Sequence, residues 1–313
     1  MKNKILLIII FFFATVRAFA ANGAPEADTF LWRISKANQP TSYLVGTMHI
    51  APKNTPLPPN VQAALSRSQQ LVMESHEDKN NVIGMVSMMR FMVSHKTLGE
   101  NLGMERVKKL HALVAQSAVR ETLPLFDAKA YTAPWAAWYF SEFALMPSHF
   151  SLESGIDSQL ENAAIAQKMP IFGLETTEPL IMLRTIPNDV IVRSIDMRLK
   201  NVDNAKREAE KSWQWYKNNQ ARKIWAHDTS NAAFRYSAAP QDVAYLKHFL
   251  ADQLLRQRNE NWLPKLTQML PEKPTLVAVG ALHLFGEHGL IVLLRKQGYT
   301  VTPILPTQKL PMN

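Results

Sequence analysis

The sequence predicts an α/β protein with a mixed, mostly parallel central sheet that is flanked by helices and carries a long helical insertion or cap. Short apolar runs typical of buried strands recur along the chain, and stretches with apolar residues at helical spacing separate them. The helical stretches near 81–167 and 177–266 are longer than a simple connection between strands needs. We therefore expect part of the helical chain to lie beyond the sheet.

Three strands and a short helix are predicted in the first quarter of the chain. The strands cover residues 29–35, 42–46 and 70–74, and the helix covers residues 58–68. Asn38 and Pro40 stand between the first two strands and favour a turn, so these strands are expected to form a hairpin. Pro58 fits the first turn of the helix, where no backbone N–H is needed.

The second half of the chain is predicted to add three strands and a C-terminal helix. The strands cover residues 169–174, 275–279 and 300–305, and the helix covers residues 287–297 with Gly298 as its cap. Since these strands alternate with helical stretches, most of them are expected to run parallel in one sheet.

Two groups of large side chains in the first helical stretch are interpreted as packing residues. Four methionines at helical spacing are expected to fill the core. Three aromatic residues are expected to line the core or a groove. These seven residues are Met85, Met88, Met89, Met92, Trp135, Trp138 and Tyr139.

The N-terminus has the pattern of a cleaved secretory signal. Two lysines precede an unbroken apolar run over residues 5–13, and small residues follow up to Ala20. The run is too short for a membrane span, which needs about 20 apolar residues. We expect residues 1–20 to be a signal peptide and residues 21–313 to form one α/β domain. The mature chain is expected to be periplasmic or secreted, without a transmembrane anchor.

Composition removes several classes of function. The 313-residue chain contains no cysteine, so disulfides, thiol nucleophiles and thiolate metal sites are excluded. Its formal net charge is +9, but Lys and Arg are dispersed, and we expect a solvated basic surface and no nucleic-acid partner. The sequence has no His-Glu-x-x-His motif, no Gly-x-Ser-x-Gly motif and no phosphate-binding glycine loop.

Polar side chains stand at the ends of four predicted strands. Two strands run into a Gly-x-x-His turn, which places His49 and His283 directly after apolar runs. Two others end on a carboxylate, at Glu74 and Glu175. In a mostly parallel sheet these ends share one edge, where α/β proteins bind ligands. The glycine of each turn lets the backbone bend sharply, so the four side chains are expected to converge.

Imidazole and carboxylate groups together indicate a divalent-metal site. Both bind Zn²⁺ or Mn²⁺ well, and a metal with an open position lowers the pKa of bound water. A remaining carboxylate can accept the proton of that water. The same residues could act without metal, with one His as a general base held by a Glu. A structural role is a further alternative, since strand-end carboxylates also cap helices.

The other histidines show no paired ligand spacing. His76 follows Glu74 closely and is a candidate supporting residue. The remaining ones are expected at the surface, and they are His95, His111, His149, His227, His248 and His288.

Seven segments, taken in order, resemble the TraB/PrgY/GumN group, which is similar to the TIKI metalloproteases. They are Leu31-Trp-Arg-Ile-Ser, Tyr43-Leu-Val-Gly-Thr-Met-His49, Leu71-Val-Met-Glu74, Ser154-Gly-Ile-Asp157, Gly173-Leu-Glu175-Thr, Arg258-Asn259 and Val279-Gly-Ala-Leu-His283-Leu-Phe-Gly-Glu-His-Gly-Leu290. Their order and spacing are more specific than any single segment, and they cover nearly the whole mature chain. Ser75-His76 departs from the acidic or apolar residue that usually follows the first glutamate.

The resemblance implies a fold like that of the erythromycin-esterase and ChaN-like proteins, and a divalent-metal-dependent peptidase activity. Both Gly-x-x-His histidines and a glutamate are implied as essential. Asp157, Arg258 and Asn259 are implied as supporting or substrate-binding groups, although Arg258 and Asn259 look like surface residues of a polar helix. Members and relatives also bind peptides or haem or hydrolyse esters, so a binding module without turnover is another hypothesis.

Our leading hypothesis is an exported metal-dependent hydrolase that acts on a peptide or protein substrate. His49, Glu74 and His283 are assigned as ligands of Mn²⁺, Co²⁺ or Zn²⁺. Glu175 is assigned as general base, with the two glutamates interchangeable on the sequence alone. Arg258 is assigned to steady the developing oxyanion.

Overall fold

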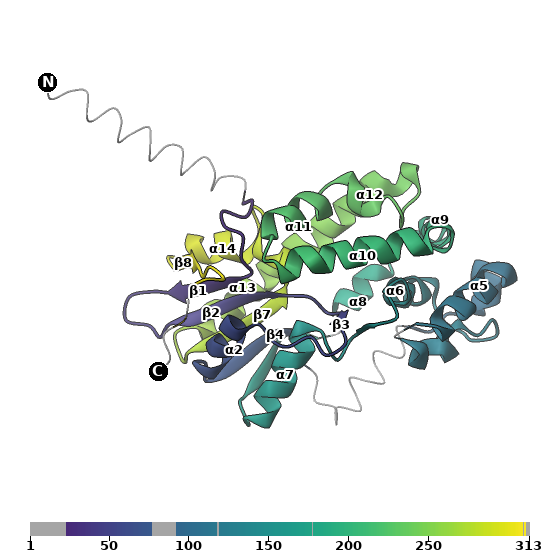
Figure 1. Ribbon diagram of the computed structural model, residues 1–313. Coiled ribbons are helices and arrows are strands. Elements are labelled where there is room, and N and C mark those ends of the chain that lie inside the picture. Colours follow the sequence, from purple (N-terminus) through teal and green to yellow (C-terminus); the bar gives the residue numbers. More distant parts are fainter. Residues whose placement is uncertain (1–22, 77–91, 118, 177, 309, 311–313) are drawn as a thin grey trace, which may run out of the picture.

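A computed structural model describes residues 23–76, 92–117, 119–176, 178–308 and 310. A six-stranded sheet with strand order β6-β4-β7-β2-β1-β8 forms its centre. Helices pack around the sheet, and the group that contains α5, α6 and α9 lies to one side of it (Figure 1). The predicted α/β class, with a mixed and mostly parallel sheet, is therefore confirmed.

The sheet places four parallel strands next to one another. Its strands are β1 (Leu31–Ser35), β2 (Ser42–Thr47), β4 (Gln70–Ser75), β6 (Ile171–Glu175), β7 (Thr275–Gly280) and β8 (Thr300–Pro303). Strands β2, β7, β4 and β6 are parallel, whereas β1 is antiparallel to both β2 and β8. The carboxyl ends of the four parallel strands thus lie side by side at one edge of the sheet.

The N-terminal hairpin forms as predicted. Trp32 in β1 lies opposite Leu44 in β2, and both side chains are fully buried. Asn38 in the turn has a φ of 58°, a left-handed conformation that Asn adopts more readily than most residues. All of β2 is buried, as expected for a strand covered on both faces.

Helices and short 3-10 or π segments connect the strands. They are α2 (Pro59–Ser66), α4 (Leu98–Leu102), α5 (Met104–Ala115), η1 (Arg120–Phe126), α6 (Pro134–Ala144), α7 (Ile156–Ala166), α8 (Glu178–Leu183), α9 (Asn188–Lys200), α10 (Val202–Lys217), α11 (Ala221–Asp228), η2 (Asn231–Phe234), η3 (Pro240–Asp242), α12 (Val243–Phe249), η4 (Leu250–Gln257), α13 (Arg258–Met269), η5 (Ala281–Leu284) and α14 (Leu290–Lys296).

Buried hydrophobic side chains form two clusters. The sheet core contains the strands of the large sheet together with α2, α7, α10, α11, α13 and α14. The helical core joins α4, α5, α6, α9 and α12. Phe143 and Leu152 pack against both clusters, so the two cores are continuous.

The first long helical stretch is broken into several elements. Gly103, with a φ of 84°, separates α4 from α5, and Pro134 starts α6. A short strand also lies within this stretch, because β5 (Phe150–Ser151) pairs with β3 (Ala51–Pro52). Helix propensity over 81–167 therefore identified the class of structure but did not show these breaks.

The predicted packing residues have different outcomes. Met85, Met88 and Met89 lie outside the described residues. The other four residues belong to the helical core. Trp135 is buried in it, and three pack at its boundary: Met92, Trp138 and Tyr139.

The C-terminal helix begins later than predicted. Residues up to Leu284 form η5, and α14 starts only at Leu290, directly after Gly289. Gly298 follows α14 with a φ of 80°, as expected for a glycine that ends a helix. None of the described helices has both the length and the hydrophobicity that crossing a membrane requires.

Candidate active site

The sheet brings the four strand-end residues to one edge. Glu74 and Glu175 stand at the ends of β4 and β6, His49 follows β2, and His283 lies in η5 directly after β7. Because β6, β4, β7 and β2 are neighbours in that order, the four side chains come from adjacent strands.

Three of these residues border the same small space beside Gly280. A Cβ atom added to Gly280 would lie 3.1 Å from Glu74 Oε1, 3.6 Å from His283 Cδ2 and 3.9 Å from His49 Nε2. The backbone N–H of Gly280 also donates to Glu74 Oε1 at 2.5 Å. A side chain at this position would occupy the space that the three polar groups border, so glycine keeps it open.

Arg258 lies among these residues, although its sequence context looks like polar surface. Its Nη2 donates to Glu74 Oε2 at 2.5 Å and also to Glu175, and its Nε lies 3.1 Å from both carboxylate oxygens of Glu175. Nη1 donates to His283 Nε2 at 3.1 Å. The side chain of Arg258 is only 13% exposed, so one buried guanidinium balances two carboxylates.

A π-helix presents Arg258 and Asn259 to the site. The π segment η4 continues directly into α13, whose first two residues are Arg258 and Asn259. Such segments are rare and frequently occur at functional sites. Arg258 Nη1 donates to the carbonyl of Leu254 in this segment at 3.3 Å. Asn259 is buried and the Arg258 side chain is only 13% exposed, so neither residue lies on the polar surface that the sequence suggested.

His283 is buried and neutral. Its side chain is 6% exposed, and its Nδ1 lies 2.7 Å from Asn259 Oδ1. Asn259 Nδ2 in turn donates to the carbonyls of His283 and His288. Because Arg258 can only donate, Nε2 of His283 must accept, which places the ring proton on Nδ1. Burial, together with the charge of Arg258, lowers the pKa of His283 to about 4.

His49 has the opposite character. Its side chain is 54% exposed, and its Nδ1 lies 2.9 Å from Asp157 Oδ2. Partial loss of solvent opposes protonation, but the hydrogen bond and charge of Asp157, with the charge of Glu74, raise the pKa of His49 to about 9. His49 is therefore an imidazolium at neutral pH in the metal-free protein.

Packing of α7 against the first turn brings Asp157 to His49. The N–H of Ile156, the first residue of α7, donates to the carbonyl of Met48 at 2.9 Å. A Cβ atom on Gly155 would lie 2.3 Å from the carbonyl oxygen of His49, so the approach requires glycine. The Ser154-Gly-Ile-Asp157 segment thus positions a carboxylate through backbone contacts.

Glu74 and Glu175 differ in acidity. Burial alone would raise the pKa of Glu74, but the neighbouring imidazoles, Arg258 and the Gly280 N–H lower it to about 2. Since His283 is neutral in this arrangement, His49 and Arg258 supply the positive charge. Burial raises the pKa of Glu175 above its ordinary value, although Arg258 bonds to it and Trp262 Nε1 donates to it at 2.8 Å.

Sequence reasoning missed Trp262 and Tyr216. The Trp262 ring lies 4.6 Å from the His283 ring and 4.8 Å from the Arg258 guanidinium carbon. Its position four residues after Arg258 on one helix face was the available signal. Tyr216 in α10 donates from its hydroxyl to the Gly46 carbonyl at 2.7 Å and so supports the first turn.

Tyr139 lies near this centre, and four of the other histidines pair with carboxylates outside the strand-end group. Burial raises the pKa of Tyr139, and the charges of Glu74 and Arg258 also act on it. His76 pairs with Glu161 at 2.8 Å and not with Glu74. Three further histidines form four ion pairs with carboxylates: His149–Glu210, His227–Glu208, His227–Asp228 and His288–Glu260. The side chain of His227 is only 14% exposed, so its predicted surface position is wrong. Among the residues that the structure describes, no group of three His, Asp or Glu side chains is arranged to hold a metal ion.

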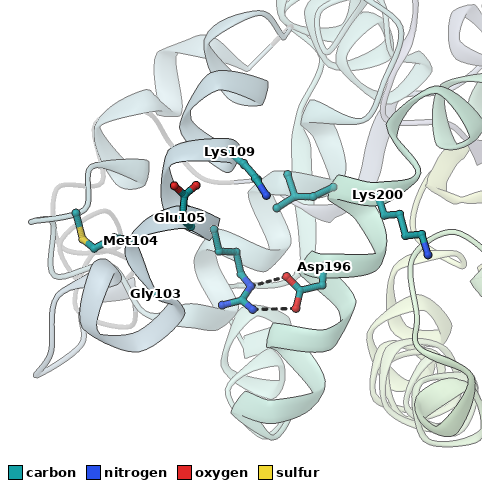
Figure 2. Close-up of a pocket in the computed structure, with 8 residues that line it drawn as sticks. Gly103, Met104, Glu105, Lys109, Asp196 and Lys200 are labelled. Carbon is teal, nitrogen blue, oxygen red and sulfur yellow. Dashed lines mark hydrogen bonds and ion pairs between the residues drawn. The ribbon is translucent and has the colours of Figure 1, made fainter.

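A surface cavity of about 520 Å³ lies elsewhere, between α5 and α9 (Figure 2). Arg106 and Asp196 form a bidentate ion pair across it, and Lys109 and Lys200 border it. None of the predicted site residues lines this cavity. We therefore place the candidate active site at the strand ends, where the titratable groups converge.

Comparison with known proteins gives one family and several relatives. The TraB/PrgY/gumN family model matches residues 30–303. The chain is 26% identical over 265 residues to the uncharacterized protein YbaP of Shigella flexneri, which covers 81% of this chain and 88% of that protein.

Two proteins named metalloprotease TIKI homolog are also similar. The one from Amphimedon queenslandica is 22% identical over 348 residues, covering 98% of this chain and 67% of that protein. The one from Nematostella vectensis is 33% identical over 69 residues, covering 21% of this chain and 15% of that protein. No solved structure gives a significant match.

Proposed function

This chain belongs to the TraB/PrgY/gumN family, and from that premise we propose that it is an exported, metal-dependent hydrolase of peptide bonds. One observation carries the proposal. His49 and His283 each have Nδ1 held by a neighbouring side chain, and both border the same space as Glu74. The distant similarity to proteins named metalloprotease TIKI homolog supports the class of reaction.

The types of donor suit a divalent metal, although the described side chains are not arranged around a common ion position. A histidine that binds metal commonly holds its other nitrogen against a carboxylate or carbonyl oxygen, which fixes the ring. Asp157 Oδ2 and Asn259 Oδ1 occupy these positions beside His49 and His283. Glu74 stays ionised and adds an oxygen donor suited to Mn²⁺, Co²⁺ or Zn²⁺. We assign His49, Glu74 and His283 as the ligands.

The other charged residues suit the chemistry around such a centre. A bound divalent ion supplies a Lewis acid that polarises a carbonyl group and acidifies water. Glu175 suits the general base, because burial raises its pKa and so strengthens its affinity for a proton. Arg258 remains charged beside it and can stabilise negative charge that develops on the carbonyl oxygen. The two glutamates thereby take different roles.

Arg258 also favours a second candidate. Its Nη1 donates to the same His283 Nε2 that a metal would need, so the arginine and a metal compete for that atom. In a metal-free hydrolase Arg258 would supply the positive charge, and the neutral His283 would act as the base once Arg258 releases its Nε2. His49 does not suit this role, because it already carries a proton at neutral pH.

Export is proposed from the sequence. The signal pattern covers residues 1–20, which lie outside the described residues. A cysteine-free chain suits a compartment that oxidises thiols, and we propose a periplasmic or secreted location.

The first test is the metal content of the mature protein. We would equilibrate the wild type and the His49→Ala/His283→Ala variant with Mn²⁺, Co²⁺ or Zn²⁺, remove free ion, and measure bound metal. The expected result is about one ion per wild-type chain and a loss of binding in the variant. Equal binding by both proteins would contradict the ligand assignment.

Hydrolysis of an unstructured peptide separates the two candidates. Chelation should abolish cleavage by the wild type, and added metal should restore it. Each single His→Ala variant should lose turnover while its unfolding transition stays close to that of the wild type. Cleavage that survives exhaustive chelation would instead support the metal-free candidate.

A further inference from the structure

Strand β6 leaves one edge of the large sheet open beside the candidate active site. It is the last strand in the sheet order and pairs only with β4 among the described strands. Its final residue is Glu175, whose carboxylate bonds to Arg258. The open edge therefore runs directly to the charged centre of the site.

The register fixes which backbone groups of β6 face outward. The N–H of Leu71 in β4 donates to the carbonyl of Pro170, and Leu71 lies opposite Ile171. In a parallel ladder the residue opposite such a donor turns its own N–H and C=O away from the partner strand. Ile171 and Gly173 thus present backbone donors and acceptors to the outside, and no partner for these groups occurs within the described part of the chain.

One apolar side chain on this edge is available to another chain, because Phe172 is 44% exposed. Gly173 has a different role: a Cβ atom there would lie 2.7 Å from the backbone nitrogen of His76, so glycine lets the chain pass over this position. An added strand would find main-chain hydrogen-bonding groups and an apolar contact at Phe172.

The opposite edge of the sheet is protected. Strand β8 contains Pro303, which has no N–H to offer. The carbonyl of Val301 accepts a hydrogen bond from Arg295 Nε at 3.2 Å. Proteins commonly block edge strands in these ways to prevent unwanted pairing. At β6, the edge that leads to the site, the described residues provide no such protection.

We propose that the outer edge of β6 binds an extended, unstructured peptide segment as an added strand and guides it to Glu175 and Arg258. This inference rests on the proposed peptide hydrolase function and names its substrate class. An unstructured segment has free backbone N–H and C=O groups along its whole length, so unstructured segments are the expected substrates.

Site-specific crosslinking tests the proposal, because the chain has no cysteine of its own. A benzophenone label on Phe172→Cys would report on the β6 edge, and the same label on Thr300→Cys would report on the β8 edge as a matched control. Both substitutions are made in a His283→Ala background with chelator, and fluorescein-labelled oxidised insulin B chain is the probe. We expect peptide crosslinking at position 172 and little at position 300.

A proline substitution that removes one outward backbone N–H of β6 tests the proposal independently. Ile171→Pro removes an outward N–H at the first residue of an edge strand, a position that tolerates proline. Ile171→Val keeps that N–H and is the control. Loss of one main-chain hydrogen bond should weaken probe binding about fivefold in the proline variant, measured by fluorescence anisotropy, with no change in the valine variant.

The outcomes separate this inference from the proposed function. Equal crosslinking at both edges, or unchanged binding by a folded Ile171→Pro variant, would overturn the β6 docking edge even if the wild type cleaves peptides. Crosslinking at position 172 without any cleavage by the metal-loaded wild type would support the docking edge and overturn the hydrolase. Absence of both would overturn both.

Discussion

The two Gly-x-x-His turns share a motif and a strand-end position but differ in almost every physical property. His49 is half-exposed, lies beside the Asp157 carboxylate and has its pKa raised to about 9. His283 is buried, lies beside the Asn259 amide and has its pKa lowered to about 4. At neutral pH one ring is charged and the other is not.

This difference shows that the partner at Nδ1 and the degree of burial decide the role of each histidine. A carboxylate beside a half-exposed ring stabilises the imidazolium, whereas an amide beside a buried ring does not compensate for lost solvent. Arg258 strengthens the contrast, because it contacts His283 and the two glutamates but has no bond to His49. Any metal that binds both rings must displace a proton from His49 and a guanidinium from His283.

The largest expected effect comes from removing the cation on the buried side. Arg258→Met would leave Glu74 and Glu175 buried without their shared partner, and breaking a buried ion pair in this way costs about 3–5 kcal/mol. Urea unfolding in chelator should show a loss of this size. Arg256→Met, in the adjoining segment η4 and paired with the partly exposed Asp252 and Glu260, is the matched control and should change stability less. Similar losses of unfolding free energy in both variants would mean that the ion pairs of Arg258 stabilise the fold no more than those of Arg256.

The two histidines should change the stability of the fold with pH in opposite directions. In chelator, the buried His283 has a folded-state pKa of about 4, below the ordinary histidine value of 6.5, so stability should fall as pH falls from 6.5 to 4. His49 has a folded-state pKa of about 9, so its contribution is present below pH 6.5 and is lost as pH rises through 9. The first effect should reach about 3 kcal/mol, and the second about 1 kcal/mol because His49 is half-exposed.

Urea unfolding of single variants at several pH values measures these contributions. His283→Ala should flatten only the acidic side of the stability profile relative to wild type, and His49→Ala only the alkaline side. His111→Ala, on an exposed part of α5, controls for the loss of a histidine as such. A single variant that flattens both sides would show that the two rings titrate as one group.

The sequence predicted the shared features of the turns and missed their differences. Apolar strands followed by Gly-x-x-His or Glu were visible as local patterns, and the parallel sheet then brings their ends together. The position of Asn259 depends on the π-helix before it, and that winding has no clear pattern in the sequence. Asp157 reaches His49 only because α7 docks on the first turn through Gly155, which is a tertiary contact. Family resemblance supplied both residues, whereas the polar helix around Asn259 had suggested a surface position for it.

The smallest expected effect comes from replacing Asp157, the partner of His49. Asp157→Asn keeps an oxygen acceptor at nearly the same position but removes the negative charge. The pKa of His49 should then fall from about 9 toward the ordinary histidine value of 6.5, with a stability loss of about 1 kcal/mol. Imidazole NMR titration of the metal-free protein measures the midpoint directly.

The reverse exchange, Asn259→Asp, provides the comparison on the buried side. A carboxylate placed against the buried ring should raise the pKa of His283, since a neighbouring negative charge favours the imidazolium. If the midpoint of His49 does not move in Asp157→Asn, its charge must come from Glu74, the other carboxylate that acts on the ring. The contrast between the turns would then arise from the shared centre of the site and not from the residue that holds each Nδ1.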